Sequence, residues 1–211
     1  MLARLFVVGV LCGCAAQPPH DAPAVFTHGV AAGDMRGDSA VLWTRTRDAR
    51  RVVPQLAGTP AFESPLALAA IDTRADDDFT ARTLAGGLEP GTRYYYRFVT
   101  GGVSSEVGTF RTPYATDDDS PVRMAFSGDA HWAWRPYPIV DSINRENLDF
   151  FFFLGDLIYE DLDEDHVAET LEQYRFKYRQ NREPREDSPG GRAWLRELYA
   201  SFGHYMVFDN D

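Results

Sequence analysis

Short apolar and aromatic runs separated by turn residues fill the first half of the chain. Residues 41–46 (VLWTRT) and 106–112 (EVGTFRT) alternate apolar and polar side chains, and residues 93–99 (RYYYRFV) are aromatic and β-branched. Such runs are typical of half-buried strands. Glycine-containing pairs punctuate them, and residues 26–112 show no helical periodicity of useful length. The pattern therefore predicts a small antiparallel β-sandwich.

The pattern changes after Pro121. Residues 122–127, 148–154 and 205–208 are short apolar runs that predict strands. The run 148–154 (LDFFFFL) is apolar at almost every position, which predicts a parallel strand covered by a layer on each face. Between these runs, apolar residues recur at helical spacing: Ile139, Val140, Ile143; Val167, Leu171, Tyr174, Tyr178; Trp194, Leu195, Leu198, Tyr199, Phe202. Alternating strands and helices predict a βαβ-type unit.

A short acidic segment lies between the two halves. Residues 114–121 lead into a proline and contain three consecutive aspartates, which repel one another and favour solvent. We therefore expect one domain at residues 24–113, an acidic linker at 114–121 and a second domain from residue 122 to 211.

Overall composition favours a folded protein and disfavours nucleic-acid binding. The 211 residues are 44% hydrophobic and 25% charged. Twenty-one lysines and arginines, against 32 aspartates and glutamates, leave a net charge of −11. A field of this sign repels nucleic acids and anionic lipids, so an anionic substrate would need a bound cation.

The N-terminal residues 1–23 resemble an export signal. Arg4 precedes an apolar run, residues 5–11, that is too short to span a bilayer. Residues 11–14 (LCGC) resemble a bacterial lipobox, which makes Cys14 the candidate for lipidation. The alternative is ordinary signal cleavage near Cys14. Both cysteines lie here, so the mature body is expected to lack a disulfide, and the protein is expected in the periplasm or cell envelope.

Polar residues follow each of the three apolar strands of the second half. Asp129 and His131 follow the first, Asp156 follows the second, and Asp209-Asn210-Asp211 follow the third. In a parallel sheet these groups would gather at one edge. Carboxylates packed together need cations, and oxygen donors with one imidazole suit ions such as Fe, Mn, Zn or Ca. A Gly-Asp pair after a strand is, by itself, more often a turn.

Several motifs resemble one enzyme family in order along the chain. Asp129-x-His131 followed by Gly155-Asp156 resembles the calcineurin-like metallophosphoesterase signature. Residues 155–160 (GDLIYE) are similar to the GDxIYE block of PhoD-like alkaline phosphatases. Residues 26–34 (FTHGVAAGD) and 40–45 (AVLWTR) resemble the opening of the PhoD sandwich, and residues 170–179 resemble its helix. The run LEPGTRYYYRF with GTFRTP resembles the end of a fibronectin type III-like domain.

The resemblance implies an α+β multidomain fold: a fibronectin type III-like β-sandwich followed by the first part of an α/β/β/α metallophosphoesterase domain. It implies an exported, monomeric enzyme that hydrolyses phosphomonoesters or phosphodiesters with a metal-activated hydroxide. It also implies a binuclear centre of Fe with Ca, or of Fe, Zn or Mn. The implied metal residues are Asp129, His131, Asp156, Tyr159, Asn210 and Asp211.

One departure concerns the iron ligand. The family has a Ser-Cys pair where this chain reads Ser127-Gly128-Asp129, so Asp129 with His131 is expected to replace the cysteine. Arg135 is a weak candidate for contact with the substrate phosphate. The third motif is cut off at Asp211, so the 211-residue segment is expected to be inactive by itself.

Three alternatives stay open. The first is a purple-acid-phosphatase-like enzyme, which also joins a β-sandwich to a metal domain. The second is a non-catalytic surface-binding lipoprotein with a degenerate metal site. The third concerns only residues 161–172, where Asp161, Asp163, Asp165 and Glu172 match EF-hand positions; His166 replaces the required glycine, so an acidic loop that caps the following helix is preferred.

Overall fold

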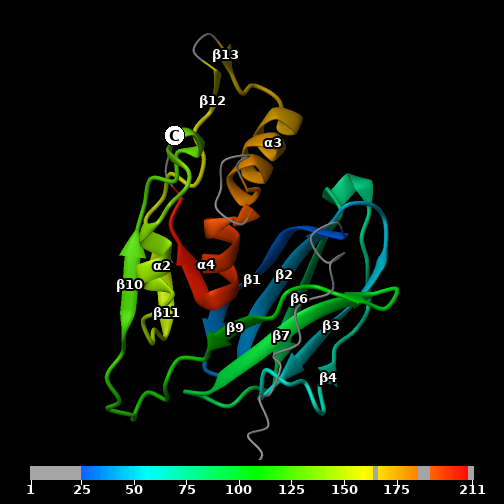
Figure 1. Ribbon diagram of the computed structural model, residues 1–211. Coiled ribbons are helices and arrows are strands. Elements are labelled where there is room, and N and C mark those ends of the chain that lie inside the picture. Colours follow the sequence, from blue (N-terminus) through cyan, green and yellow to red (C-terminus); the bar gives the residue numbers. More distant parts are fainter. Residues whose placement is uncertain (1–24, 164–165, 185–190, 209–211) are drawn as a thin grey trace, which may run out of the picture.

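The computed structural model describes residues 25–163, 166–184 and 191–208 (Figure 1). Its first half holds nine strands and one 3-10 helix in the described part of the chain. In order these are β1 (Phe26–Arg36), β2 (Ser39–Thr46), β3 (Arg51–Ala57), β4 (Leu66–Ala67), β5 (Ile71–Asp72), η1 (Ala75–Asp77), β6 (Thr80–Gly86), β7 (Arg93–Thr100), β8 (Val103–Ser104) and β9 (Gly108–Arg111).

These strands form the expected β-sandwich. Strands β1, β2 and β6 pair antiparallel in one sheet, and the order β4-β3-β7-β8 forms the other, with β5 on β3 and β9 on β7. Alternate residues of both sheets point inward because side chains alternate along a strand. The fully buried side chains between the sheets include Phe26, Leu42, Tyr96, Phe98 and Phe110. The predicted strands at 41–46, 93–99 and 106–112 are confirmed as β2, β7 and β9.

Within its described residues, the second half adds three parallel strands, a two-stranded hairpin, three α-helices and one 3-10 helix. In order the elements are β10 (Met124–Ser127), η2 (Trp132–Trp134), α2 (Ile139–Ile143), β11 (Phe150–Phe153), β12 (Asp161–Asp163), β13 (His166–Val167), α3 (Leu171–Arg182), α4 (Trp194–Ser201) and β14 (Gly203–Met206). Strands β10, β11 and β14 pair parallel in that order. The three strands predicted here are therefore confirmed, although the third lies at Gly203–Met206 and not at 205–208.

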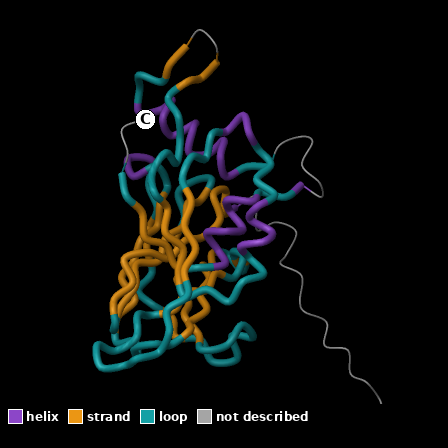
Figure 2. The backbone as a smooth tube through the Cα atoms, turned by 90° about the vertical axis from the view of Figure 1, so that its left-hand side faces the viewer, coloured by secondary structure: helices purple, strands orange, loops and turns teal. Residues whose placement is uncertain are grey.

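A single sheet runs through both halves of the chain. Strand β14 pairs parallel with β1, with Ala32 opposite Gly203 and Gly33 opposite His204. The six-stranded order is therefore β10-β11-β14-β1-β2-β6. In Figure 2 the helices gather around the upper part of these strands and the β12–β13 hairpin projects beyond them. The parallel strands are thus held rigidly against the sandwich, while the domain limits stated above stay a prediction.

The expectation that residues 148–154 are covered on both faces holds only in part among the described residues, since Phe150 packs against the sandwich core on the second face. Phe151 and Phe153 are buried under α2 and α4, in a second core with Leu198. Phe150 and Phe152, on the opposite face, are only half-buried. On the same face, Phe126 of the neighbouring β10 is 64% exposed. The helices cover one face of the sheet, and no described element covers the other at β10.

Helix α3 begins four residues later than Val167, the first residue of its predicted apolar spacing. Val167 lies in the β12–β13 hairpin, which occupies the EF-hand-like segment. Thr170 caps the helix: its hydroxyl accepts from the Gln173 N–H, and the Gln173 side chain accepts from the Thr170 N–H. This capping box, not the preceding acidic residues, satisfies the first turn. Among the described helices, none is long and apolar enough to cross a membrane.

Candidate metal centre

Two adjacent parallel strands deliver the candidate ligands Asp129 and Asp156. Strands β10 and β11 pair in register, and each is followed within three residues by one of these aspartates. The Ala130 N–H donates to the Asp156 carbonyl oxygen at 2.8 Å, so the two loops are joined directly. The carboxyl ends of the strands therefore bring together two groups that are 27 positions apart in the sequence.

Both aspartates have an uncommon backbone conformation. The φ angles are +58° at Asp129 and +51° at Asp156. This left-handed region costs most non-glycine residues free energy, and such residues cluster at functional sites.

Tyr159 joins the two carboxylates. Its hydroxyl lies 2.7 Å from Asp129 Oδ1, to which it donates, and 3.3 Å from Asp156 Oδ2. Desolvation raises the pKa of the Tyr159 phenol, and the hydrogen bonds and negative charges of Asp129 and Asp156 raise it further. The phenol consequently keeps its proton in this arrangement. Three of the expected metal residues thus converge on one point.

His131 lies beside this group but makes other contacts. Its ring centroid is 4.8 Å from that of Tyr159. Nε2 lies 3.2 Å from Asp161 Oδ2, and Nδ1 accepts from the Ala133 N–H at 3.2 Å. Because Nδ1 is an acceptor here, the neutral imidazole carries its proton on Nε2 and donates it to Asp161. Metal ligation by His131 would require release of one of these bonds, and it stays a prediction.

A buried asparagine that the sequence interpretation missed holds both loops. Asn181, on α3, is 5% exposed. Its Nδ2 donates to the carbonyl oxygens of Ala130 at 2.7 Å and Leu157 at 2.8 Å. These residues directly follow Asp129 and Asp156, so one amide group fixes the position of both ligand-bearing loops. Its position two residues after the helix-like segment 170–179 was the only signal in the sequence, and it did not indicate this contact.

Further contacts brace the same loops. The Tyr137 hydroxyl donates to the His131 carbonyl oxygen at 2.7 Å. The Lys177 ammonium, also on α3, donates to the Asp161 carbonyl oxygen and lies 4.9 Å from the centroid of the Trp132 ring. Burial lowers the pKa of Lys177. Helix α3 therefore holds the loops through hydrogen bonds from Lys177 and Asn181 to their backbone carbonyls. These two residues are four positions apart and lie on one helical face.

The remaining predicted site residues lie elsewhere. Arg135 donates through Nε to the Trp132 carbonyl at 2.8 Å and through Nη1 to the carbonyls of Gln180 and Glu183. These bonds tie η2 to the end of α3, so a contact with substrate stays a prediction. Asn210, Asp211 and Cys14 fall outside the described residues.

The converging side chains fit a hard metal ion. Within the residues that the structure describes, no three His, Cys, Asp or Glu side chains converge on one point. The Tyr159 hydroxyl oxygen nevertheless lies within 3.3 Å of one carboxylate oxygen of Asp129 and one of Asp156. Carboxylate and phenol oxygens are the donors that hard cations prefer. Asp129, Asp156 and Tyr159 are therefore the described residues that could hold such an ion.

Comparison with known proteins agrees with this arrangement. Residues 13–114 match the family described as "PhoD-like phosphatase, N-terminal domain", and residues 124–189 match "PhoD-like phosphatase". Alkaline phosphatase D of Bacillus subtilis (strain 168) is 29% identical over 210 residues, covering 88% of this chain and 35% of that protein. The solved structure titled "Structure of PhoD" has a TM-score of 0.78 at 29% identity and covers 88% of this chain and 39% of that one.

The fold and these matches define an α+β protein in which a fibronectin type III-like β-sandwich precedes a mixed α/β sheet of phosphoesterase type. The chain belongs to the PhoD-like phosphatase family, whose members use metal ions. It spans little more than a third of the length of the relatives that it matches.

Proposed function

We propose that the protein is an exported, metal-dependent phosphoesterase that hydrolyses phosphomonoesters or phosphodiesters. One observation supports this most directly. Asp129 and Asp156, at the carboxyl ends of neighbouring parallel strands, both lie within hydrogen-bond distance of the Tyr159 hydroxyl. An oxygen-rich cluster on a rigid sheet edge is suited to hold cations that bind phosphate.

In this proposal each residue has a distinct role. Asp156 would bridge two cations, Asp129 with His131 would serve one of them, and Tyr159 would bind iron. Asn210 and Asp211 would reach the second cation, which would be Ca, Zn or Mn. When bound, such a pair of cations lowers the pKa of a coordinated water and neutralises phosphate charge. Asp161 would orient His131 through the contact at its Nε2.

The test is to express the gene product through its natural stop codon and to measure its metal content and its hydrolysis of p-nitrophenyl phosphate and bis(p-nitrophenyl) phosphate. We expect Asp156→Asn and Asp129→Asn to lower kcat/KM by about 100-fold or more, as loss of a metal ligand does. Asp72→Asn, which removes an exposed carboxylate paired with Arg51 on the sandwich, should leave it within about twofold. If the unmodified protein binds its full complement of metal but hydrolyses neither substrate, the proposed phosphoesterase activity is refuted and a non-catalytic binding lipoprotein is supported.

The export proposal has its own test. Residues 1–14 end in the lipobox-like LCGC, so we propose that Cys14 becomes the lipidated N-terminus. Metabolic labelling with a fatty-acid analogue should mark the protein in the membrane fraction, and Cys14→Ser should abolish the label. A labelled Cys14→Ser variant would contradict lipidation at this residue, and an unlabelled but secreted protein would point to ordinary signal cleavage.

A further inference from the structure

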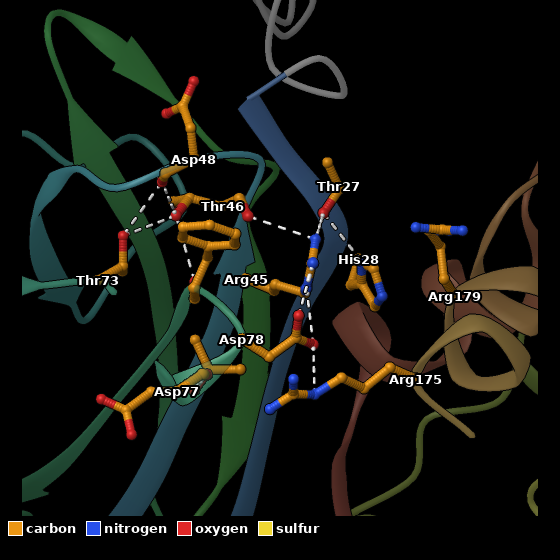
Figure 3. A network of polar contacts seen from close by, with 12 residues as sticks. Thr27, His28, Arg45, Thr46, Asp48, Thr73, Asp77, Asp78, Arg175 and Arg179 are labelled. Carbon is orange, nitrogen blue, oxygen red and sulfur yellow. Dashed lines mark hydrogen bonds and ion pairs between the residues drawn. The ribbon is translucent and has the colours of Figure 1, made fainter. Parts of the chain in front are cut away.

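A cleft of ≈ 700 Å³ lies between the sandwich and α3. The residues used so far for the metal centre do not line it. One wall comes from the sandwich, where His28 of β1, Arg45 of β2 and Asp78 after η1 meet. The other wall is the face of α3 that carries Arg175 and Arg179. Figure 3 shows Arg45 and Arg175 on opposite sides of Asp78, with His28 and Arg179 nearby.

Arg45 and Asp78 neutralise each other. Arg45 donates to both oxygens of Asp78, through Nε at 3.0 Å and Nη2 at 2.8 Å. Its Nη1 donates to the Thr27 hydroxyl at 3.0 Å. This two-pronged pair uses the donors of Arg45 and orients the carboxylate of Asp78. The Arg45–Asp78 ion pair therefore lines the cleft without adding net charge to it.

The two arginines of α3 are much less engaged. Among the described residues, the closest carboxylate contact of Arg175 is 3.8 Å, to Asp78, and that of Arg179 is 3.7 Å, to Glu183 just after α3. In the described portion of the chain, neither guanidinium makes a hydrogen bond. Their side chains are 37% and 43% exposed. Two like charges one helical turn apart repel each other and destabilise the helix. An anion bound between the two guanidinium groups would reduce this repulsion.

His28 adds a neutral, buried group at the side of the cleft. Burial, and then the positive charges of Arg182 and Arg45, lower the pKa of His28 to about 3, so the ring carries no charge at neutral pH. Its Nδ1 lies 2.9 Å from the Thr27 hydroxyl. When Nδ1 accepts from this hydroxyl, Nε2 carries the proton and is a donor on the wall of the cleft.

The side chains that line the cleft carry a net positive charge, whereas the whole chain is negatively charged. Three arginines line it, against the carboxylates of Asp78 and Glu172, whereas the chain carries a net charge of −11. Glu172 forms no ion pair with either helical arginine among the described residues. Phe176 lies under Arg179, with 5.3 Å from the guanidinium to the ring centroid, and is 40% exposed. The cleft thus combines two guanidinium groups that make no hydrogen bond among the described residues with an apolar surface.

From this geometry we propose that the cleft binds a phosphate group, held between Arg175 and Arg179 with His28 as a third donor. Guanidinium groups present paired N–H donors that match the oxygens of phosphate. A dianion fits two such groups better than a single carboxylate does, since each arginine can receive its own pair of oxygens. The bound group is either free orthophosphate or the phosphate of an organic monoester whose apolar part contacts Phe176.

The test counts phosphate bound by the whole protein. Equilibrium dialysis with labelled orthophosphate should show a site that Arg175→Gln with Arg179→Gln either removes or weakens by about tenfold or more, the usual effect of losing charge-assisted hydrogen bonds. The matched control is Arg36→Gln with Arg51→Gln, which removes two arginines, each 69% exposed and paired with an aspartate outside the cleft. The control should retain phosphate binding.

Additional variants separate this site from the metal centre. Asp156→Asn should affect only phosphate bound at the metal centre, so cleft binding survives even when the proposed phosphoesterase activity does not. Arg179→Gln alone, which among the described residues removes only the ion pair with Glu183 just after α3, should fold and still weaken phosphate binding. In the Asp156→Asn variant, which should not hydrolyse it, phenyl phosphate that competes more tightly than orthophosphate would identify an organic ligand, and equal or weaker competition would identify free phosphate. Unchanged phosphate binding in the folded double variant would overturn the proposal.

Discussion

The ligand-bearing aspartates are held by residues that do not themselves reach the metal position. A left-handed conformation at Asp129 or Asp156 costs on the order of 1–3 kcal/mol and persists only where the surroundings impose it. Asn181 supplies that constraint, since its single amide group bonds to the next backbone carbonyl after each aspartate. The geometry of the candidate centre therefore depends on a side chain from a separate helix.

We predict that Asn181→Ala lowers metal affinity and kcat/KM by about 10–100-fold, the range found when groups that orient ligands are removed. It should also lower the free energy of unfolding by about 1–3 kcal/mol, because two buried carbonyls lose their donor. Metal titration and steady-state kinetics measure the first effect, and urea unfolding measures the second. Asn147→Ala, which removes an exposed asparagine bonded to Arg93, is the control. Reduced stability with unchanged metal affinity would contradict a positioning role.

At the scale of elements, α4 joins the two halves. Arg196 of α4 forms a two-pronged pair with Glu106 of the sandwich, at 2.7 Å and 2.8 Å. Gly29 of β1 lies against this pair, with a φ of +73°. A Cβ at this position would lie 2.5 Å from Arg196 Cγ and 2.6 Å from Glu106 Oε1. Glycine is therefore required both by the backbone and by the approach of the helix.

Gly29→Ala should consequently lower the free energy of unfolding by about 2–4 kcal/mol, through backbone strain and displacement of a partly buried ion pair. Chemical denaturation followed by tryptophan fluorescence measures the change. Gly58→Ala is the matched control, because no atom lies within 4 Å of the added methyl group and no positive φ is needed there. If the two variants have the same free energy of unfolding, α4 can move away from the added methyl group without loss of stability.

The sequence predicts whether a segment is a helix or a strand where its apolar residues recur on one face, which is then buried. The strands at 41–46, 93–99 and 148–154 and the helix at 194–201 follow directly from their apolar spacing. Val167 was assigned to a helix because its spacing to Leu171 is helical, yet the capping box at Thr170 starts the helix later. The second face of residues 148–154 is only partly covered among the described residues, because an apolar run does not reveal which element packs on it.

At the scale of the whole molecule, the interior of the joint between sandwich and parallel strands contains uncharged histidines. His28 on β1 and His204 on β14 are buried. Burial, and then the positive charge of Arg182, lower the pKa of each to about 3. In the unfolded chain both would titrate near 6.5. The folded state therefore binds fewer protons below that pH, so stability is fully present above pH 6.5 and is lost as pH falls toward 3.

We predict that the free energy of unfolding falls by up to about 1.4 kcal/mol per pH unit for each of these histidines as pH falls from 6 to 5. Urea unfolding at pH 7, 6 and 5 gives the slope, and His204→Gln should remove about half of it. An unchanged slope in that variant would mean that His204 already binds a proton in the folded state.

The sequence by itself determined the order of elements, the sandwich, the family resemblance and the placement of Asp129, Asp156 and Tyr159 just after two strands. It did so because strand periodicity and motif spacing are local properties. Only the tertiary structure decided that β14 continues the sandwich sheet beside β1, that Asn181 holds both ligand loops, and that Arg175 and Arg179 face His28 across a cleft. These contacts join residues far apart in the chain, and packing rather than local pattern selects them.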